Sequence, residues 1–290
     1  MAKRPEAAQG KETRGYALGE VDTIISVDEV AREARRLAEK GPSVERIAEL
    51  AMGAPLVKID RLLAGYGKME ILHGFNLQVA QGQSLCLIGP NGAGKSTVLH
   101  SIYGFTNITG GSISVDGKDV TRLGANQKLR LGVAYILQDN SVFPDMTVEE
   151  NLWMGGYLKE RPEEARRAAE RVFERYPRLA KRRRQRAGVL SGGERRLLEI
   201  SRALVMEPEV LLVDEPSIGL EPRFIDMVFE ILDDLQHGEG KTIIMVEQNA
   251  KKGLEFADIG YVLVDGILAL AGPGDELLED PEVGRLFLGG

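Results

Sequence analysis

The sequence contains almost no cysteine and no long apolar segment. Cys86 is the only cysteine among 290 residues, so no disulfide can form within the chain, which suits a reducing compartment. No apolar run approaches the roughly 20 residues that a helix needs to span a bilayer. The first 15 residues also lack the apolar stretch of a secretory signal. Contact with a membrane is therefore expected to require a partner protein.

An excess of basic residues is also missing. The formal net charge is −7, which argues against a dedicated nucleic-acid-binding protein. One local exception is a basic cluster late in the chain, which on its own suggests nucleic-acid binding. Because the whole chain is acidic, we favour an exposed helix face near a membrane partner or anionic head groups. The cluster comprises Arg178, Lys181, Arg182, Arg183, Arg184 and Arg186.

The most informative stretch lies between residues 84 and 104. A short apolar run typical of a buried strand precedes a loop that matches G-x-x-x-x-G-K-[ST], and residues at helical spacing follow. The glycines allow successive backbone N–H groups to point at an anion, and the helix dipole adds to that field. Lys95 supplies a positive charge for the β- and γ-phosphates, and the Ser96 hydroxyl can bind Mg²⁺. The predicted ATP-binding residues of this loop are Gly89, Pro90, Asn91, Gly92, Ala93, Gly94, Lys95, Ser96 and Thr97.

The pattern of elements around this loop predicts an α/β fold. Val57 and Ile59 alternate with polar residues, as do residues 75–79, which predicts strands. Asp116-Gly117 predicts a turn between short antiparallel strands, with Ile113 and Val115 on one face before it. Helical patterns fill residues 140–192. Apolar strands at 210–213 and 242–246 then alternate with helices, as in a parallel sheet covered on both faces. We expect residues 56–290 to form a P-loop NTPase core with a mainly parallel sheet, an antiparallel β subdomain and an α-helical subdomain at about 140–192.

Residues 1–55 precede this pattern as an N-terminal extension. Apolar spacing predicts two short helices, at 27–38 and at 43–52, the second with Val44, Ile47, Ala48 and Ala51 on one side. Such an extension either packs against the core or remains a poorly ordered tail. A regulatory role is the alternative.

Two acidic residues follow the apolar strand at 210–213. Asp214, at the carboxyl end of a parallel strand beside the phosphate loop, can hold Mg²⁺ through water. Glu215 is then placed to accept a proton from an attacking water. Pro216 follows, so a plain strand end at a turn is the alternative interpretation.

A second candidate anion site lies in Leu190-Ser191-Gly192-Gly193-Glu194. Ser191 and Glu194 have the spacing of a capping box. Two consecutive glycines at a helix start are costly unless another group must approach the backbone closely. A serine hydroxyl with bare N–H groups at a helix N-terminus can bind an anion. Since one nucleotide is already served by the phosphate loop, this site suggests a phosphate presented by another subunit.

The motifs GPNGAGKST, LSGGE and LLVDEPS occur in an order and spacing that resemble the ATP-binding subunits of ABC transporters, from about Leu56 to the C-terminus. The resemblance implies that Tyr66 stacks on adenine. It implies that Gln138 contacts Mg²⁺, together with Ser96 and Asp214, and moves with the helical subdomain. Residues 217–222 correspond to the D-loop, although Gly219 and Glu221 depart from its commonest pattern.

Gln248 stands where most relatives carry a histidine. A glutamine can hydrogen-bond a γ-phosphate but cannot gain charge near neutrality. With it, the implied catalytic residues are Glu215, Lys95 and Gln248. The segments VEQNA and ENLWMGGYLKER and the terminal LGG are similar to one branch, the second ATPase subunit (F-type) of branched-chain amino-acid uptake systems, including related amide and urea importers.

The resemblance also implies cofactors and partners. The cofactors are ATP and Mg²⁺, with ATP held between the phosphate loop of one subunit and Ser191, Gly192, Gly193 and Glu194 of another. The partners are a second ABC ATPase subunit, identical or different, transmembrane permease subunits and, indirectly, a solute-binding protein; no nucleic acid is expected. The subunit would lie peripherally on the cytoplasmic side of the cell membrane and drive import of a small solute. The solute itself cannot be read, because its contacts lie in other chains.

Two other classes of ABC ATPase share this chemistry. A DNA-repair or chromosome-organising ATPase needs a long coiled coil between the phosphate loop and LSGGE, where this chain has about 100 residues without long heptads. A ribosome-associated factor usually holds two such domains in one chain, and this sequence contains a single phosphate loop. Both differences favour a transporter subunit, and the two other classes are the alternatives.

Overall fold

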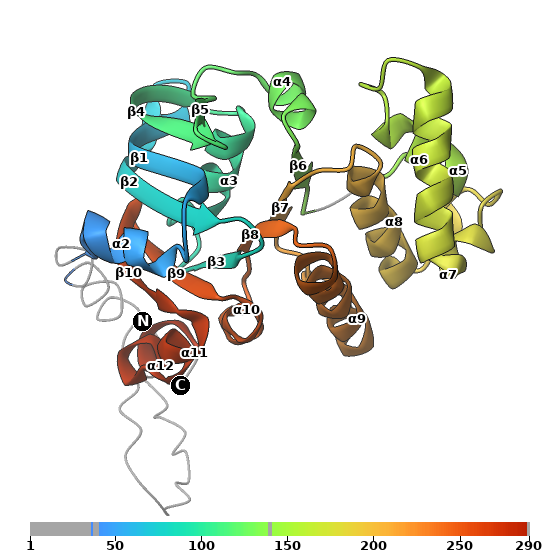
Figure 1. The fold of residues 1–290 in the computed structure, drawn as a ribbon. Coiled ribbons are helices and arrows are strands. Elements are labelled where there is room, and N and C mark those ends of the chain that lie inside the picture. Colours follow the sequence, from blue (N-terminus) through green and yellow to red (C-terminus); the bar gives the residue numbers. More distant parts are fainter. Residues whose placement is uncertain (1–35, 37–40, 139–140, 289–290) are drawn as a thin grey trace, which may run out of the picture.

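The structure is a computed structural model that describes residue 36, residues 41–138 and residues 141–288. In this part of the chain, two β-sheets lie beside a block of helices (Figure 1). Apart from residue 36, the helix expected at 27–38 falls outside the described residues. None of the helices in the described ranges is both long and apolar enough to cross a membrane.

The larger sheet has six strands in the order β10-β9-β3-β8-β7-β6, parallel except for β10, which is antiparallel to β9. Its strands are buried on both faces, which explains their continuous apolar sequences. Along β3, Leu85 and Leu87 belong to one hydrophobic core, whereas Cys86 and Ile88 belong to the other. The predicted mainly parallel core is therefore confirmed. The strands are β3 (Ser84–Ile88), β6 (Val133–Ile136), β7 (Val210–Asp214), β8 (Thr242–Val246), β9 (Ile259–Val264) and β10 (Ile267–Pro273).

Helices cover the two faces of this sheet. Helix α3 packs on one face through Val98, Leu99 and Ile102. Helices α8, α9 and α10 pack on the other, and two short helices end the described chain. Helix α9 continues into a π-helical turn, η2 (Asp234–Gly238). The helices are α3 (Lys95–Tyr103), α8 (Gly192–Leu204), α9 (Pro222–Asp233), α10 (Ala250–Phe256), α11 (Gly274–Glu279) and α12 (Pro281–Phe287).

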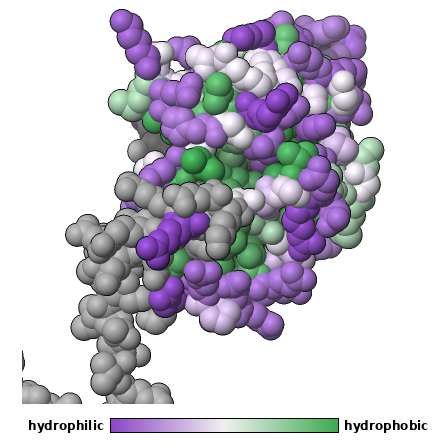
Figure 2. Space-filling view, turned by 90° about the vertical axis from the view of Figure 1, so that its left-hand side faces the viewer, coloured by the Kyte–Doolittle hydropathy of each residue, from purple (hydrophilic) through white to green (hydrophobic). Residues whose placement is uncertain are grey.

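The predicted antiparallel subdomain is the second sheet, in the order β2-β1-β4-β5. Its last turn is formed by Asp116 and Gly117, both with positive φ (50° and 70°), as a tight two-residue hairpin turn requires. On the face that carries this sheet, hydrophilic residues predominate, with hydrophobic residues showing in small groups between them (Figure 2). The strands are β1 (Pro55–Tyr66), β2 (Met69–Ala80), β4 (Asn107–Val115) and β5 (Lys118–Asp119).

The second helix expected in the extension is present as α2 (Val44–Leu50), capped by Ser43. Ile47 and Leu50 are buried, and the Gln83 side-chain amide donates to the Leu50 carbonyl at 3.1 Å. The predicted buried side was partly wrong, because Val44 and Ala48 are exposed and Leu50 joins the core instead. Residues 44–50 thus pack against the core of the protein.

A third hydrophobic core belongs to the helical block. Leu152, Ala169 and Phe173 form it together with Leu197 and Leu198 of α8, so α8 joins this block to the sheet. A capping box formed by Thr147 and Glu150 begins α5. The extent of the helical subdomain, about 140–192, stays a prediction. The remaining elements are α4 (Ala125–Arg130), α5 (Val148–Gly155), α6 (Pro162–Arg175), α7 (Pro177–Ala180) and η1 (Ala187–Val189).

Candidate functional site

The loop between β3 and α3 depends on glycines at two positions. Gly89 has φ of 139°, and a Cβ atom there would lie 2.2 Å from the carbonyl oxygen of Leu263. Gly94 caps α3 with φ of 98°. A larger residue would be strained at either position. The loop therefore wraps the N-terminus of α3, where the helix dipole favours an anion.

Lys95 lies across this loop. Its Nζ donates to the backbone oxygens of Gly89 at 2.8 Å and of Pro90 at 3.0 Å. Burial lowers the pKa of Lys95, and the charges of Glu215 and Asp214 oppose that effect. The ammonium group is thus held by neutral carbonyls beside two acidic residues, where phosphate oxygens would be stronger partners.

Both carboxylate oxygens of Asp214 accept hydrogen bonds from hydroxyl groups. Ser96 Oγ donates to Oδ1 at 3.1 Å, and Tyr135 Oη donates to Oδ2 at 2.7 Å. Asp214 ends β7, and its parallel neighbour β8 lies between β7 and β3. Because the carboxyl ends of parallel strands share one edge, Asp214 comes beside the phosphate loop, as the sequence predicts.

Glu215 and Gln138 are bonded to each other. The side-chain amide nitrogen of Gln138 donates to Glu215 Oε2 at 2.9 Å. Glu215 has φ of 43°, a left-handed conformation that is uncommon outside glycine and asparagine, and its N–H donates to the Val246 carbonyl at 2.8 Å. The β8 backbone thus fixes Glu215 where its carboxylate meets Gln138.

The residues around Ser96 fit a magnesium ion. Within residues 41–138 and 141–288, no three His, Cys, Asp or Glu side chains gather into a metal-binding group. Mg²⁺ does not need one, since it is usually held by one or two protein oxygens together with phosphates and waters. Ser96 and Asp214 supply a hydroxyl and a carboxylate at the edge of the phosphate loop. When bound, Mg²⁺ would neutralise charge on the transferred phosphoryl group.

Tyr66 ends β1 and is 41% exposed. Its hydroxyl is hydrogen-bonded to Nδ1 of His100 on α3, and the two rings meet edge to face at 5.9 Å between centroids. Burial and the charge of Asp214 raise the pKa of Tyr66, whereas a side-chain hydrogen bond with Thr97 lowers it. Tyr66 thus lies next to the helix that carries Lys95 and Ser96, and its stacking on a base stays a prediction.

Gln248 lies on the loop after β8 and is exposed. Its neighbour Glu247 is 1% exposed and accepts three hydrogen bonds. They come from Ser217 Oγ at 2.7 Å, the Ser217 N–H at 3.3 Å and the Asn249 N–H at 2.9 Å. Glu247 therefore ties the start of segment 217–222 to the loop that carries Gln248.

Ser191 caps α8, and Glu194 completes the expected capping box. A Cβ atom at Gly193 would lie 2.1 Å from the Phe224 ring, whereas one at Gly192 would meet only Leu220 at 3.7 Å. Packing against Phe224 thus explains why residue 193 is glycine. Packing within the chain does not explain Gly192, which is the glycine that an approaching anion would require. Glu194 also pairs with Arg182 at 2.5 Å.

The basic cluster lies beside this segment, and two of its arginines are held in ion pairs. Arg182 pairs with Glu194, and Arg183 pairs with Glu149 and Glu170, each at 2.5 Å. These two arginines support the fold of the helical block, because each is paired with an acidic side chain.

The structure brings most of the predicted site together at one edge of the larger sheet. Direct hydrogen bonds connect Ser96 with Asp214 and Gln138 with Glu215. The segment Ser191–Glu194 opens α8 instead, which lies beyond β6 and β7 from α3 in the view of Figure 1. Arg196, on the next turn of α8, donates to the backbone oxygens of Gln138 at 3.5 Å and Asp214 at 3.4 Å. The contact of Ser191–Glu194 with another chain stays a prediction.

Sequence reasoning missed Tyr135, His100 and Glu247. Tyr135 lies in an apolar strand, so its pattern indicates an ordinary core residue, and only the pairing of β6 with β7 places it near Asp214. Glu247 stands beside Gln248 in the sequence. Glu247 directly follows a buried strand, as Glu215 does, and this position was the signal in the sequence that could have identified it.

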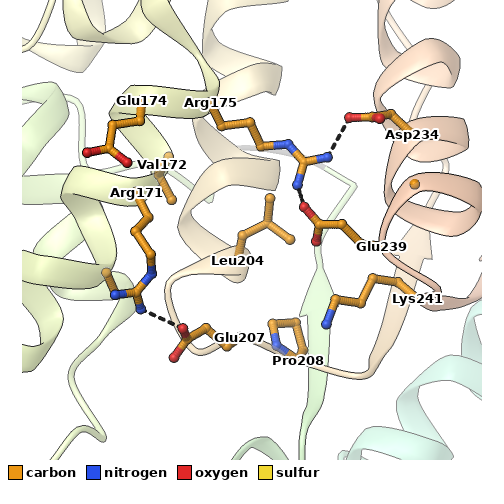
Figure 3. Close-up of a pocket in the computed structure, with 12 residues that line it drawn as sticks. Arg171, Val172, Glu174, Arg175, Leu204, Glu207, Pro208, Asp234, Glu239 and Lys241 are labelled. Atoms are coloured by element: carbon orange, nitrogen blue, oxygen red, sulfur yellow. Dashed lines mark hydrogen bonds and ion pairs between the residues drawn. The ribbon is translucent and has the colours of Figure 1, made fainter.

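A cavity of about 700 Å³ lies outside this site, between α6 and the turn after α8 (Figure 3). Ion pairs cross it: Arg171 with Glu207 at 2.5 Å, and Arg175 with Asp234 at 2.6 Å and with Glu239. None of its lining residues belongs to the predicted site. The crossing ion pairs connect the helical block to the core, and we assign the cavity no ligand.

Comparison with known proteins agrees with this geometry. A family model described as ABC transporter matches residues 72–218. The chain is 40% identical to the high-affinity branched-chain amino acid transport ATP-binding protein BraG of Pseudomonas aeruginosa, over 81% of this chain and all of that protein. It is 36% identical to the probable branched-chain amino acid transport ATP-binding protein LivF of Archaeoglobus fulgidus, over 81% of this chain and 99% of that protein. A lipopolysaccharide export system ATP-binding protein, LptB of Acidithiobacillus ferridurans, is 32% identical over 81% of this chain and 97% of that protein.

Solved structures of similar fold are also ATP-binding cassettes. A nucleotide-free ATP-binding cassette from an ABC transporter is 26% identical, with a TM-score of 0.72, over 82% of this chain and all of that one. The ADP conformation of an ATP-binding cassette of an ABC transporter is also 26% identical, with a TM-score of 0.73, over 82% of this chain and all of that one. The chain belongs to the ABC transporter family, as one of its ATP-binding subunits, and it is an ATPase.

Proposed function

We propose that this subunit couples ATP hydrolysis to the uptake of branched-chain amino acids. The observation that carries the proposal is the similarity, over their whole lengths, to two proteins named for branched-chain amino acid transport. The lipopolysaccharide export protein is less similar, at 32% identity. Uptake of a related solute, such as an amide or urea, is the alternative function.

In this proposal, residues 89–97 bind the phosphates of ATP, and Tyr66 stacks on the base. Lys95 neutralises charge on the β- and γ-phosphates. Ser96, Asp214 and Gln138 hold Mg²⁺, for which the Ser96–Asp214 hydrogen bond supplies the support. Catalysis then rests on positioning and charge stabilisation.

Glu215 is proposed as the general base that accepts a proton from the attacking water. Its contact with Gln138 links it to the chain segment that leads into the helical block. Gln248 is proposed as an uncharged sensor of the γ-phosphate, on a loop anchored by Glu247.

A second ATPase subunit completes the site. We propose that Ser191, Gly192, Gly193 and Glu194 contact the ATP held by the partner's phosphate loop. The exposed Ser191 and Gly192 at the start of α8 support this role, because their backbone is accessible at a helix N-terminus. The partner can be a second copy or a different ATPase.

Permease subunits are the proposed membrane partners, which would place this subunit at the cytoplasmic face of the membrane. A groove of about 340 Å³ between the sheet and the helical block supports this docking. Phe143, Met154 and Tyr157 line it and are 42%, 41% and 55% exposed. Exposed apolar side chains around a groove suit a short apolar segment of a partner.

The test is co-purification followed by transport. The tagged subunit would be isolated from native membranes, its permease partners identified, and the assembly reconstituted in vesicles. We expect ATP-dependent uptake of radiolabelled leucine that is lost in Lys95→Ala. Recovery of lipopolysaccharide-export components instead, or uptake of urea or an amide without leucine, would contradict the proposed solute.

A further inference from the structure

We propose that Tyr135 is a positioning residue for Asp214, orienting the carboxylate that would hold Mg²⁺ through water. The inference deepens the proposed function and rests on its assignment of Asp214 and Ser96 to the metal. No motif contains Tyr135, and its role emerges only from the contacts of its hydroxyl.

In the structure, Asp214 is held from two sides. Ser96 donates to Oδ1 at 3.1 Å, and Tyr135 donates to Oδ2 at the shorter distance of 2.7 Å. Asp214 is 5% exposed, so water has little access to replace either donor. A carboxylate with two fixed donors keeps one orientation.

Both donors can remain when the metal is bound. A hydroxyl has one proton and two lone pairs, so Ser96 Oγ can turn a lone pair toward Mg²⁺ and keep its proton on Oδ1. Ser96 would then contact the metal and Asp214 together, whereas Tyr135 contacts Asp214 alone, through Oδ2. Tyr135 is thus the partner that orients the Asp214 carboxylate toward a metal-bound water, as partners of metal-site carboxylates commonly do.

The tyrosine is suited to this task by its surroundings. Its ring packs among Tyr103, His100 and Phe105, with centroid distances of 5.4, 5.7 and 6.1 Å. A tyrosine hydroxyl carries its proton near neutral pH and here donates it to Asp214. The packed ring limits the positions that Oη can take.

The experiment measures nucleotide binding without turnover. The affinity for a fluorescent, non-hydrolysable ATP analogue is determined by titration in EDTA and in saturating Mg²⁺, and the ratio gives the metal-linked gain. Tyr135→Phe keeps the ring and removes the hydroxyl. We expect it to leave the affinity in EDTA unchanged and to lower the metal-linked gain by about 10-fold, the lower end of the roughly 10- to 100-fold range for removing a partner of a metal ligand.

Two matched variants separate the possible causes. Tyr103→Phe removes a hydroxyl from the same aromatic cluster and should retain the full metal-linked gain. Asp214→Asn should lose at least as much of the gain as Tyr135→Phe. Equal losses in the two phenylalanine variants, or a full gain in Tyr135→Phe while Asp214→Asn loses it, would overturn the role of Tyr135. A full gain in Asp214→Asn would overturn the proposed metal site, and this inference with it.

Discussion

The side-chain amide of Gln138 donates a 2.9 Å hydrogen bond to the carboxylate of Glu215. Glu215 follows Asp214 at the end of β7, and Gln138 follows β6, the strand paired with β7. The two strands therefore deliver the proposed base and the glutamine to one place. A contact of this kind positions a carboxylate without taking its proton-accepting capacity.

Replacing Glu215 by glutamine should stop hydrolysis and preserve ATP binding. The amide has nearly the same shape but cannot accept a proton, so phosphate release should fall by roughly 10²- to 10⁴-fold. Phosphate release and nucleotide affinity would be measured on the same preparation. Glu215→Gln with nearly wild-type turnover would remove Glu215 from the role of base.

Gln248→Ala should slow turnover only by about 2- to 10-fold, because it removes one neutral hydrogen bond. The comparison with Glu215→Gln is made under saturating ATP. A larger loss in Gln248→Ala than in Glu215→Gln would reverse the two roles.

Tyr66→Ala should weaken binding of ATP and GTP alike, by about 2- to 10-fold, because stacking depends on the ring face of the base. Tyr66→Phe retains the ring, loses the contact with His100 and should bind nearly as well as the wild type. Equilibrium titration with both nucleotides checks this. A loss confined to GTP would show that Tyr66 has another function.

Glu247→Ala should lower the free energy of unfolding by about 2–4 kcal/mol, since it leaves the two buried donors of Ser217 and the partly buried N–H of Asn249 without their acceptor. Glu247→Gln keeps one acceptor oxygen and should cost less. Urea unfolding with an unchanged m value would measure both. Stability of the alanine variant within 0.5 kcal/mol of wild type, well below the expected ~2 kcal/mol, would show that these bonds contribute little.

Lys128 should make the stability depend on alkaline pH. It is fully buried, its Nζ donates to the Ser101 carbonyl at 3.2 Å, and burial lowers its pKa from 10.5 to about 8, with Asp119 opposing. Between pH 8 and 10.5 the unfolded chain binds more protons, so folding stability rises with pH in that window. Below pH 8 the buried charge is a constant cost.

Lys128→Met removes that cost and should be more stable than wild type at pH 7, by at most about 3 kcal/mol. The advantage should shrink as the pH rises from 8 to 10.5. Chemical denaturation of both proteins at several pH values tests this. An advantage that is independent of pH would contradict the lowered pKa of Lys128.

Most of the fold could be predicted from sequence because local patterns are unambiguous here. The buried strands are continuous apolar runs, and the ends of α5 and α8 carry complete capping boxes. Residues in the phosphate loop, Asp214 and Glu215 were found because their chemistry fixes their sequence spacing. Their meeting at one edge then followed from parallel strands.

The contacts of Tyr135 and Glu247 could not be predicted, because they depend on which strands are neighbours. Tyr135 reaches Asp214 across the β6–β7 pair, 79 residues away in the chain. Gly193 shows the opposite case, in which a glycine attributed to an external anion is required by the Phe224 ring. Local sequence does not record such packing.

The central claim is that each ATP site is shared between two chains, and mixing two inactive variants tests it most directly. Lys95→Ala damages the phosphate loop of its own chain, and Ser191→Arg blocks the segment that its chain offers to a partner. Each variant alone forms pairs in which both sites are damaged. In a mixed pair, one site carries both lesions and the other has an intact loop facing an intact Ser191.

The measurement is ATPase activity after mixing, with subunit exchange followed by labelled chains. We predict that each variant alone is inactive and that the mixture regains activity in proportion to exchange. Full activity of Ser191→Arg alone, or background activity in a mixture whose exchange is complete, would contradict a site shared in this way.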